Sequence, residues 1–182
     1  RGAASALALL IEAHPVEPSL LPMRPQAPVV TLQEITAHTV RAVTDLRVSA
    51  LQESYVASNA VSIAQAYFHP QAWFRAICYD GLAVGFVMLE DPTLLPDWIG
   101  PAQVGLWRFM IDARHQGRGH GRAALRLVIE HVRTRPGQTL LRASCVPGPH
   151  SPIGFYERCG FRRTGEVDDG EEVLELTLSA GG

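Results

Sequence analysis

Short runs of apolar residues, bounded by glycine, proline or charged residues, recur along the chain from residue 29 onward. Apolar runs of about four to eight residues between turn signals are typical of β-strands. The expected strands cover residues 29–35, 73–79, 82–89, 106–111, 139–146, 161–166 and 173–178. Asp80 and Gly81 separate the second run from the third, and this dipeptide indicates a tight β-hairpin.

A different spacing of apolar residues predicts the helices. Leu125, Val128, Ile129 and Val132 recur at intervals of three and four, which predicts an amphipathic helix over residues 123–134. The remaining helices are expected over residues 39–51, 59–67 and 152–159.

The ends of two helices carry recognisable caps. Asn59 is the expected N-cap of the helix over 59–67. For the last helix, Ser151 is the expected N-cap, Pro152 suits the first position, and Gly160 suits the residue beyond the end. The order of elements predicts a mixed α/β (α+β) domain, with a largely antiparallel central sheet flanked by helices.

The amino-acid composition argues against several classes of protein. The chain has 182 residues, of which 47% are hydrophobic, and a formal net charge of −2. We therefore expect neither disorder nor a nucleic-acid partner. No apolar stretch approaches the roughly 20 residues that span a membrane. Cys78, Cys145 and Cys159 are too scattered for a disulfide framework or a zinc site, so no metal is expected. A cytoplasmic protein is the simplest interpretation.

The first 28 residues differ from the rest of the chain. They are rich in Ala, Leu and Pro, and an apolar run over residues 3–11 follows a single arginine. A single positive charge is fewer than a secretory signal peptide usually carries before its apolar segment. We expect residues 1–28 to be a flexible or artificially appended extension, and residues 29–182 to form a single domain.

Residues 114–122 read Arg-His-Gln-Gly-Arg-Gly-His-Gly-Arg and lie between an expected strand and an expected helix. The N–H groups of a first helical turn have no partner within the helix and lie at the positive end of its dipole. Glycines at alternate positions let the backbone approach a bound group, and three arginines add charge. The pattern indicates a cradle for phosphate or pyrophosphate.

Two common phosphate loops do not fit this segment. A Walker loop needs Lys and then Ser or Thr after its last glycine, and a dinucleotide fingerprint needs Gly-x-Gly-x-x-Gly. Gln116-x-x-Gly119-x-Gly121 instead resembles the coenzyme A pyrophosphate loop of the GNAT superfamily of N-acetyltransferases. Residues 155–161, Phe-Tyr-Glu-Arg-Cys-Gly-Phe, are similar to the second signature of that superfamily.

The resemblance covers roughly residues 29–178, and it is closest to bacterial spermine/spermidine (diamine) N-acetyltransferases. The segments that carry it are residues 62–66, 71–77, 84–89, 106–112 and 133–137. It implies the acyl-CoA N-acyltransferase fold of GNAT proteins and acetyl-CoA or coenzyme A as cofactor. It also implies a small-molecule amine acceptor, a polyamine or diamine such as spermidine or spermine. One departure is the turn at residues 147–150, where many members carry an Asn that contacts the coenzyme arm.

The resemblance also implies roles for individual residues. Tyr156 would donate a proton or a hydrogen bond to the departing thiolate. Main-chain groups of Phe109, Met110 and Ile111 would hold the acetyl group and the pantetheine arm. Transfer would be direct, with Cys145 a core residue and not a nucleophile. The cradle residues that would hold the cofactor are Gln116, Gly117, Arg118, Gly119, His120, Gly121 and Arg122.

The acceptor amine must lose a proton, because a primary alkylamine resembles lysine and has a pKa of about 10.4. A carboxylate, directly or through water, would assist. The candidates for this carboxylate are Glu53, Glu90 and Asp91, and Glu90 is preferred because it ends the strand next to the cradle strand. Glu53 and Asp91, with Trp98 and Trp107, are expected to attract and stack a polycationic acceptor.

Two other interpretations remain open. In one, the acceptor is a protein amine or an antibiotic. In the other, the chain is a non-catalytic acyl-CoA-binding module, although an intact Tyr156 argues against that role. A homodimer is common in this superfamily, and the sequence leaves the oligomeric state open.

Overall fold

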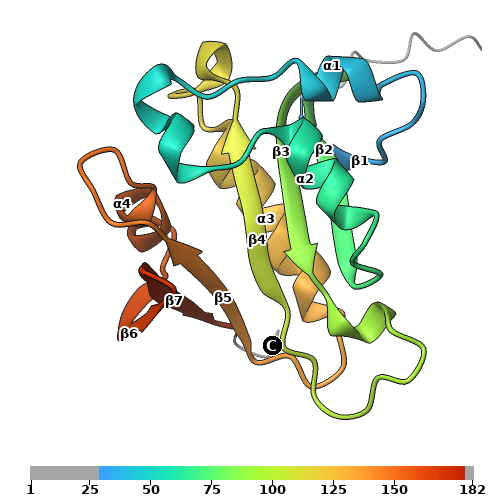
Figure 1. The fold of residues 1–182 in the computed structure, drawn as a ribbon, viewed down its shortest axis with the longest axis vertical. Helices are drawn as coiled ribbons and strands as arrows, with labels where there is room; N and C mark the ends of the chain where they lie inside the picture. The colour runs from blue at the N-terminus through green and yellow to red at the C-terminus, as the bar shows by residue number, and fades with distance from the viewer. Residues whose placement is uncertain (1–28, 179–182) are drawn as a thin grey trace, which may run out of the picture.

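The computed structural model describes residues 29–178, which form a seven-stranded sheet with helices on both faces (Figure 1). The strand order is β1-β2-β3-β4-β5-β7-β6. Neighbouring strands are antiparallel, except that β4 and β5 are parallel. The expected mixed, mostly antiparallel sheet is confirmed. The extension expected at residues 1–28 lies outside the described residues.

The elements follow the expected order along the chain. The strands are β1 (Val30–Gln33), β2 (Ala72–Tyr79), β3 (Leu82–Glu90), β4 (Gly105–Ile111), β5 (Leu140–Cys145), β6 (Arg162–Asp168) and β7 (Glu171–Thr177). The α-helices are α1 (Val40–Thr44), α2 (Asn59–Ala66), α3 (His120–Arg133) and α4 (Ile153–Arg158). The short 3-10 helices are η1 (Ala50–Tyr55), η2 (Pro92–Leu94) and η3 (Ala113–His115).

The core lies on both faces of the sheet. Helix α3 buries Leu125, Val128 and Val132 against one face, as its spacing predicts. On the other face, Val43 of α1 packs with Phe86 of β3 and its neighbours. In Figure 1, α3 lies behind the strands, while α1 and α2 lie on the near side. Strands β2, β3 and β4 therefore lie between two layers of helix.

The helix expected over residues 39–51 is wrong in its second half, because α1 ends at Thr44 and η1 begins at Ala50. Between them, the Arg47 N–H donates to the Asp112 carboxylate at 3.0 Å, and the Arg47 carbonyl accepts from the Ala113 N–H at 2.8 Å. A helix needs these same backbone groups for its own hydrogen bonds. Contacts with a distant segment therefore interrupt the helix.

The expected N-cap at Asn59 is also wrong. Ser58 caps α2, and its hydroxyl accepts from the Val61 N–H at 3.3 Å. Asn59 is buried instead, and its side-chain amide donates to the Val43 carbonyl at 2.9 Å. The side chain that was expected to cap the helix joins α2 to α1.

The last helix begins later than expected. Its N-cap is Pro152, not Ser151, and α4 starts at Ile153. The expected glycine after its end is confirmed, because Gly160 has a φ of +98°, which favours glycine. The chain therefore turns sharply after α4 and enters β6 through the buried Phe161.

Candidate active site

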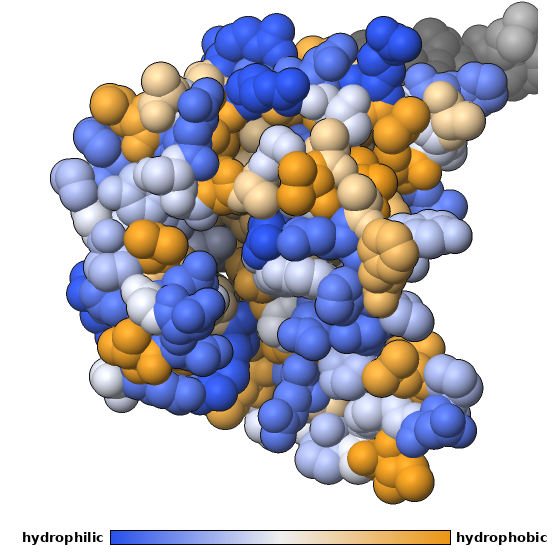
Figure 2. Space-filling model, viewed as in Figure 1, coloured by the Kyte–Doolittle hydropathy of each residue, from blue (hydrophilic) through white to orange (hydrophobic). Residues whose placement is uncertain are grey.

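A cavity of about 1060 Å³ lies between the diverging ends of β4 and β5. The two strands pair at Gly105–Arg142 and Leu106–Ala143 and then separate toward the end of β4 (Figure 1). Figure 2 shows the molecule hollowed on this face, between the part that carries β4 and the part that carries β5. Residues from η1, β4, the segment before α3, β5, α4 and β7 line the cavity.

The predicted phosphate cradle forms one wall of this cavity. Gly117 and Gly119 have φ values of +73° and +83°, a conformation that favours glycine. Gly119 is the N-cap of α3 and supplies no side-chain cap, so the first-turn N–H groups remain for a bound group. A β-carbon on either glycine would meet no atom within 4 Å. The space beside these two glycines is therefore free of other protein atoms.

Basic side chains surround the cradle. Arg122 and Arg158 line the cavity, whereas Arg118 is exposed and lies outside its lining. Burial lowers the pKa of His120, and the nearby His115 and Arg118 lower it further. His120 is therefore neutral at neutral pH, and the arginines and the helix dipole supply the positive potential.

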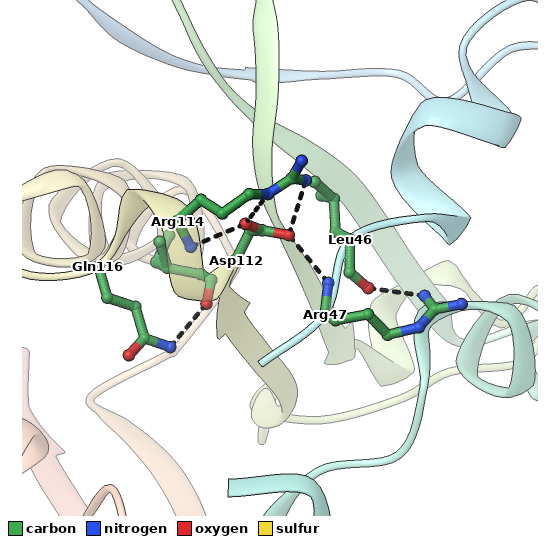
Figure 3. Close-up of polar contacts among 6 residues, drawn as sticks. Leu46, Arg47, Asp112, Arg114 and Gln116 are labelled. Carbon is green, nitrogen blue, oxygen red and sulfur yellow. Dashed lines mark hydrogen bonds and ion pairs between the residues drawn. The ribbon is translucent and has the colours of Figure 1, made fainter. Parts of the chain in front are cut away.

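Gln116 lies next to the cradle and is engaged within the protein. Its side-chain amide donates to the Ile111 carbonyl and to Gln52 Oε1, each at 2.9 Å. Figure 3 shows the amide turned toward the end of β4. An amide nitrogen has two hydrogens, so both donors of Gln116 are used. Gln116 lines the cavity, but these bonds make it a support for the cradle.

A buried carboxylate fixes the start of the cradle segment. Asp112 is 1% exposed and accepts from the Arg114 side chain at 2.8 and 3.1 Å, as well as from the N–H groups of Arg47 and Arg114 (Figure 3). The Arg114 hydrogen bonds lower the pKa of Asp112 to about 2. Arg114 is therefore committed to Asp112.

The edge of β4 forms the floor of the cavity. Phe109, Met110 and Ile111 line it, as expected for the segment that would hold the acyl arm. Within residues 29–178, β4 has no strand partner on this side beyond Leu106. Main-chain groups at this edge are thus available, apart from the Ile111 carbonyl that Gln116 occupies. Phe109 also stacks on Phe155 of α4, with 5.9 Å between ring centroids.

Tyr156 lies in the part of the lining that α4 supplies. It is 5% exposed, lines the cavity and packs against Phe155 and Phe161. Burial raises the pKa of its phenol well above the ordinary value, and the neighbouring Cys145 and Cys159 raise it further. The phenol therefore stays protonated. Burial also raises the pKa of the Cys145 thiol to about 12, so that thiol is neutral and a poor nucleophile.

The candidate acceptor residues divide into two groups. Glu53 and Trp107 line the cavity, whereas Glu90, Asp91 and Trp98 lie outside its lining. Glu90 is exposed at the end of β3, beside Gly105.

Asp91 is engaged by neighbouring residues of the protein. It is fully buried, forms an ion pair with Arg135 at 2.6 Å, and accepts from the Thr93 N–H and hydroxyl. Trp98 is half-buried against the main core. These surroundings favour roles in folding for Asp91 and Trp98.

Sequence reasoning missed a second carboxylate in the cavity. Glu171, the first residue of β7, is half-buried, lines the cavity and accepts from the Ser144 hydroxyl. The turn before it is at Asp169 and Gly170, both with positive φ. No sequence signal distinguishes Glu171 from its neighbours, because its position depends on the pairing of β7 with β5.

Residues 29–178 contain no group of three His, Cys, Asp or Glu side chains that could hold a metal ion. None of their helices combines the length and the apolar character that a membrane crossing requires.

Comparison with known proteins identifies relatives of the chain. The sequence model of the acetyltransferase (GNAT) family matches residues 40–161. A spermine/spermidine N(1)-acetyltransferase of Bacillus subtilis (strain 168) is 31% identical over 157 residues, which cover 82% of this chain and 99% of that protein.

Solved structures share the fold. An aminoglycoside acetyltransferase AAC(6')-Ib in complex with coenzyme A matches with a TM-score of 0.65 and 19% identity, over 81% of this chain and 94% of that one. The ribosomal-protein-S18-alanine N-acetyltransferase of Escherichia coli matches with a TM-score of 0.58 and 18% identity, over 85% and 97%. These two proteins are named for very different acceptors, so the fold alone does not identify the acceptor.

Proposed function

Because the chain belongs to the acetyltransferase (GNAT) family, it is an acetyl-CoA-dependent N-acetyltransferase, and we propose that its acceptor is a polyamine or diamine. The expected family, enzyme class and cofactor are confirmed. The observation that carries the proposed acceptor is the 31% identity to a spermine/spermidine acetyltransferase across 99% of that enzyme.

The residues of the cavity fit coenzyme A. Backbone N–H groups at Gly119, Gly121 and the start of α3, with Arg122 and Arg158 nearby, would hold the diphosphate. The free edge of β4 at Phe109 and Met110 would hold the arm. Acetyl-CoA, when bound, supplies the thioester carbonyl that the amine attacks.

Two carboxylates give the cavity a cation-binding character. Glu53 of η1 and Glu171 of β7 both line it, and they come from elements far apart in the sequence. A polyamine carries several ammonium groups separated by methylene chains. Carboxylates would bind these ammonium groups, and the Trp107 ring would contact the methylene chain.

Each chemical step has a candidate residue in the cavity. Glu171 or Glu53, directly or through water, would accept a proton from the bound ammonium, and the neutral amine that results would attack the thioester carbonyl. Tyr156, protonated at neutral pH, would donate a hydrogen bond or its proton to the departing sulfur. Glu171 and Glu53 replace Glu90 as the proposed carboxylates, because both line the cavity and Glu90 does not.

An amine panel tests the acceptor. Release of free thiol from acetyl-CoA would be measured with spermidine, spermine, putrescine, a lysine peptide, an N-terminal peptide and an aminoglycoside. We expect kcat/KM to be highest for a polyamine or diamine. A higher value for a peptide or the aminoglycoside would overturn the proposed acceptor. Absence of thiol release with every amine, despite cofactor binding, would instead support the non-catalytic binding module.

A further inference from the structure

The 3-10 helix η1 joins the two walls of the cavity. At one end, the Tyr55 hydroxyl approaches Gly148 of the β5–α4 loop so closely that a β-carbon there would collide with it. In the middle, Gln52 accepts a hydrogen bond from Gln116, next to the cradle. Glu53, the proposed acceptor ligand, lies between these two attachments. The acceptor wall is thus connected to both sides of the cofactor site.

A single oxygen atom of Gln52 accepts all the hydrogen bonds that make this connection. Gln52 Oε1 accepts from Gln116 Nε2 at 2.9 Å, from the Ser49 hydroxyl at 3.1 Å and from the Ser49 N–H at 3.3 Å. The Ser49 bonds cap the start of η1. Gln116 Nε2 also donates to the Ile111 carbonyl. One pair of amides therefore links η1, the end of β4 and the cradle.

The chain just before η1 is held independently. Arg47 is bound through its N–H to Asp112 and through its carbonyl to the Ala113 N–H. Those bonds do not involve Gln52. Loss of the Gln52 oxygen should therefore loosen η1 locally, with residues 45–48 remaining in place.

We propose that Gln52 is a positioning residue that couples the cofactor cradle to the acceptor wall. A diphosphate that orders residues 117–122 also orders Gln116, whose amide holds Gln52 and so fixes Glu53 and Tyr55 for the amine. Coupling between two binding events is reciprocal, so the acceptor must also strengthen cofactor binding. The inference rests on the proposed function for the identity of the acceptor, but the coupling itself can be measured with coenzyme A alone.

Kinetics of three variants test the proposal. Gln52→Leu removes the accepting oxygen, Gln52→Glu keeps it, and Gln33→Leu makes the same exchange at an exposed position in β1. For Gln52→Leu we expect KM for the best amine at saturating acetyl-CoA to rise roughly fivefold, the value of one hydrogen bond, while the Kd of coenzyme A measured by calorimetry without amine stays within about twofold of wild type. Gln52→Glu should keep the wild-type KM, and Gln33→Leu should not change it. An unchanged amine KM, or an equal rise in the Kd of coenzyme A without amine, would overturn the proposal.

Hydrogen exchange supplies a readout that needs no acceptor. Coenzyme A should slow amide exchange at residues 117–122 and 49–55 in the wild type. In Gln52→Leu it should still slow exchange at 117–122 but no longer at 49–55. Retained protection of 49–55 in that variant would refute the coupling and leave the proposed enzyme intact. Lack of protection at 117–122 in the wild type would refute the cofactor site and the coupling with it.

Discussion

The high pKa of the Tyr156 phenol limits how it can assist departure of the thiolate. A free thiol has a pKa of about 8.5 and a phenol one of about 10, so full proton transfer from Tyr156 to the thiolate is uphill even without burial. Burial raises the pKa of Tyr156 further. Donation of a hydrogen bond to the developing charge is therefore its more effective contribution.

Replacement of Tyr156 by Phe removes that hydrogen bond and little else, because the ring still packs against Phe155 and Phe161. We expect kcat to fall at least about tenfold. The dissociation constant of coenzyme A, measured by calorimetry, should be nearly unchanged. Tyr67→Phe is the matched control, since Tyr67 is 85% exposed and lies outside the cavity lining. If kcat of Tyr156→Phe equals that of the wild type, Tyr156 has no role in the mechanism.

Asp112 gives a prediction about pH. Its pKa is lowered from 3.8 to about 2 in the folded protein, so the ionised carboxylate stabilises the fold above pH 3.8, and this contribution is lost as the pH falls to about 2. Asp112→Asn should be less stable than the wild type by about 1 to 2 kcal/mol at neutral pH. Urea unfolding across this range should show the difference shrinking as the pH falls. A difference that does not depend on pH would show that charge at Asp112 is unimportant.

At the scale of elements, backbone conformation decides whether the cradle works. Gly119 and Gly165 have nearly the same φ, +83° and +84°, and a β-carbon on either would meet nothing within 4 Å. Gly119 caps α3 in the cavity, whereas Gly165 is in the exposed strand β6. The two positions therefore separate the cost of backbone strain from the loss of a binding site.

Alanine at either position should reduce the free energy of unfolding by about 1 to 2 kcal/mol, because left-handed backbone disfavours a side chain. Only Gly119→Ala should weaken coenzyme A binding, by at least about tenfold, since the N–H groups that we propose as diphosphate ligands would be displaced. Thermal melts and calorimetry on both variants measure the two effects. Equal coenzyme A affinity in the two variants would exclude this loop as the diphosphate site.

Local sequence patterns predicted those elements whose conformation does not depend on contacts with distant segments. The periodic apolar face of α3 and the Asp80–Gly81 turn required no knowledge of distant segments, and both were found. The helix expected over residues 39–51 failed because Arg47 bonds to Asp112 and Ala113, and no local pattern reports such a contact. Gln52 and Glu171 were missed for the same reason. Most of the proposed cofactor-binding residues come from one continuous segment, residues 109–122, which a local pattern can indicate, whereas the proposed acceptor-binding residues come from several segments.

At the scale of the whole molecule, the cavity lies where the sheet divides. Within residues 29–178, pairing between β4 and β5 is limited to two residue pairs, and the two parts of the sheet diverge beyond them. Residues of both parts line the cavity: β4 and the start of α3 on one side, β5, α4 and β7 on the other. A molecule that fills this space adds contacts between the two parts that the sheet itself does not provide.

Cofactor binding should therefore stabilise the entire domain. A ligand that binds only the folded state at about 100 times its dissociation constant adds about 2.7 kcal/mol. For a chain of this size, that corresponds to a rise in Tm of about 5 to 10 °C. Differential scanning fluorimetry with coenzyme A should show this rise in the wild type and in Tyr156→Phe, and a smaller one in Gly119→Ala at the same concentration. Equal shifts in all three would mean that the ligand binds elsewhere, because only Gly119→Ala changes the backbone that holds the diphosphate.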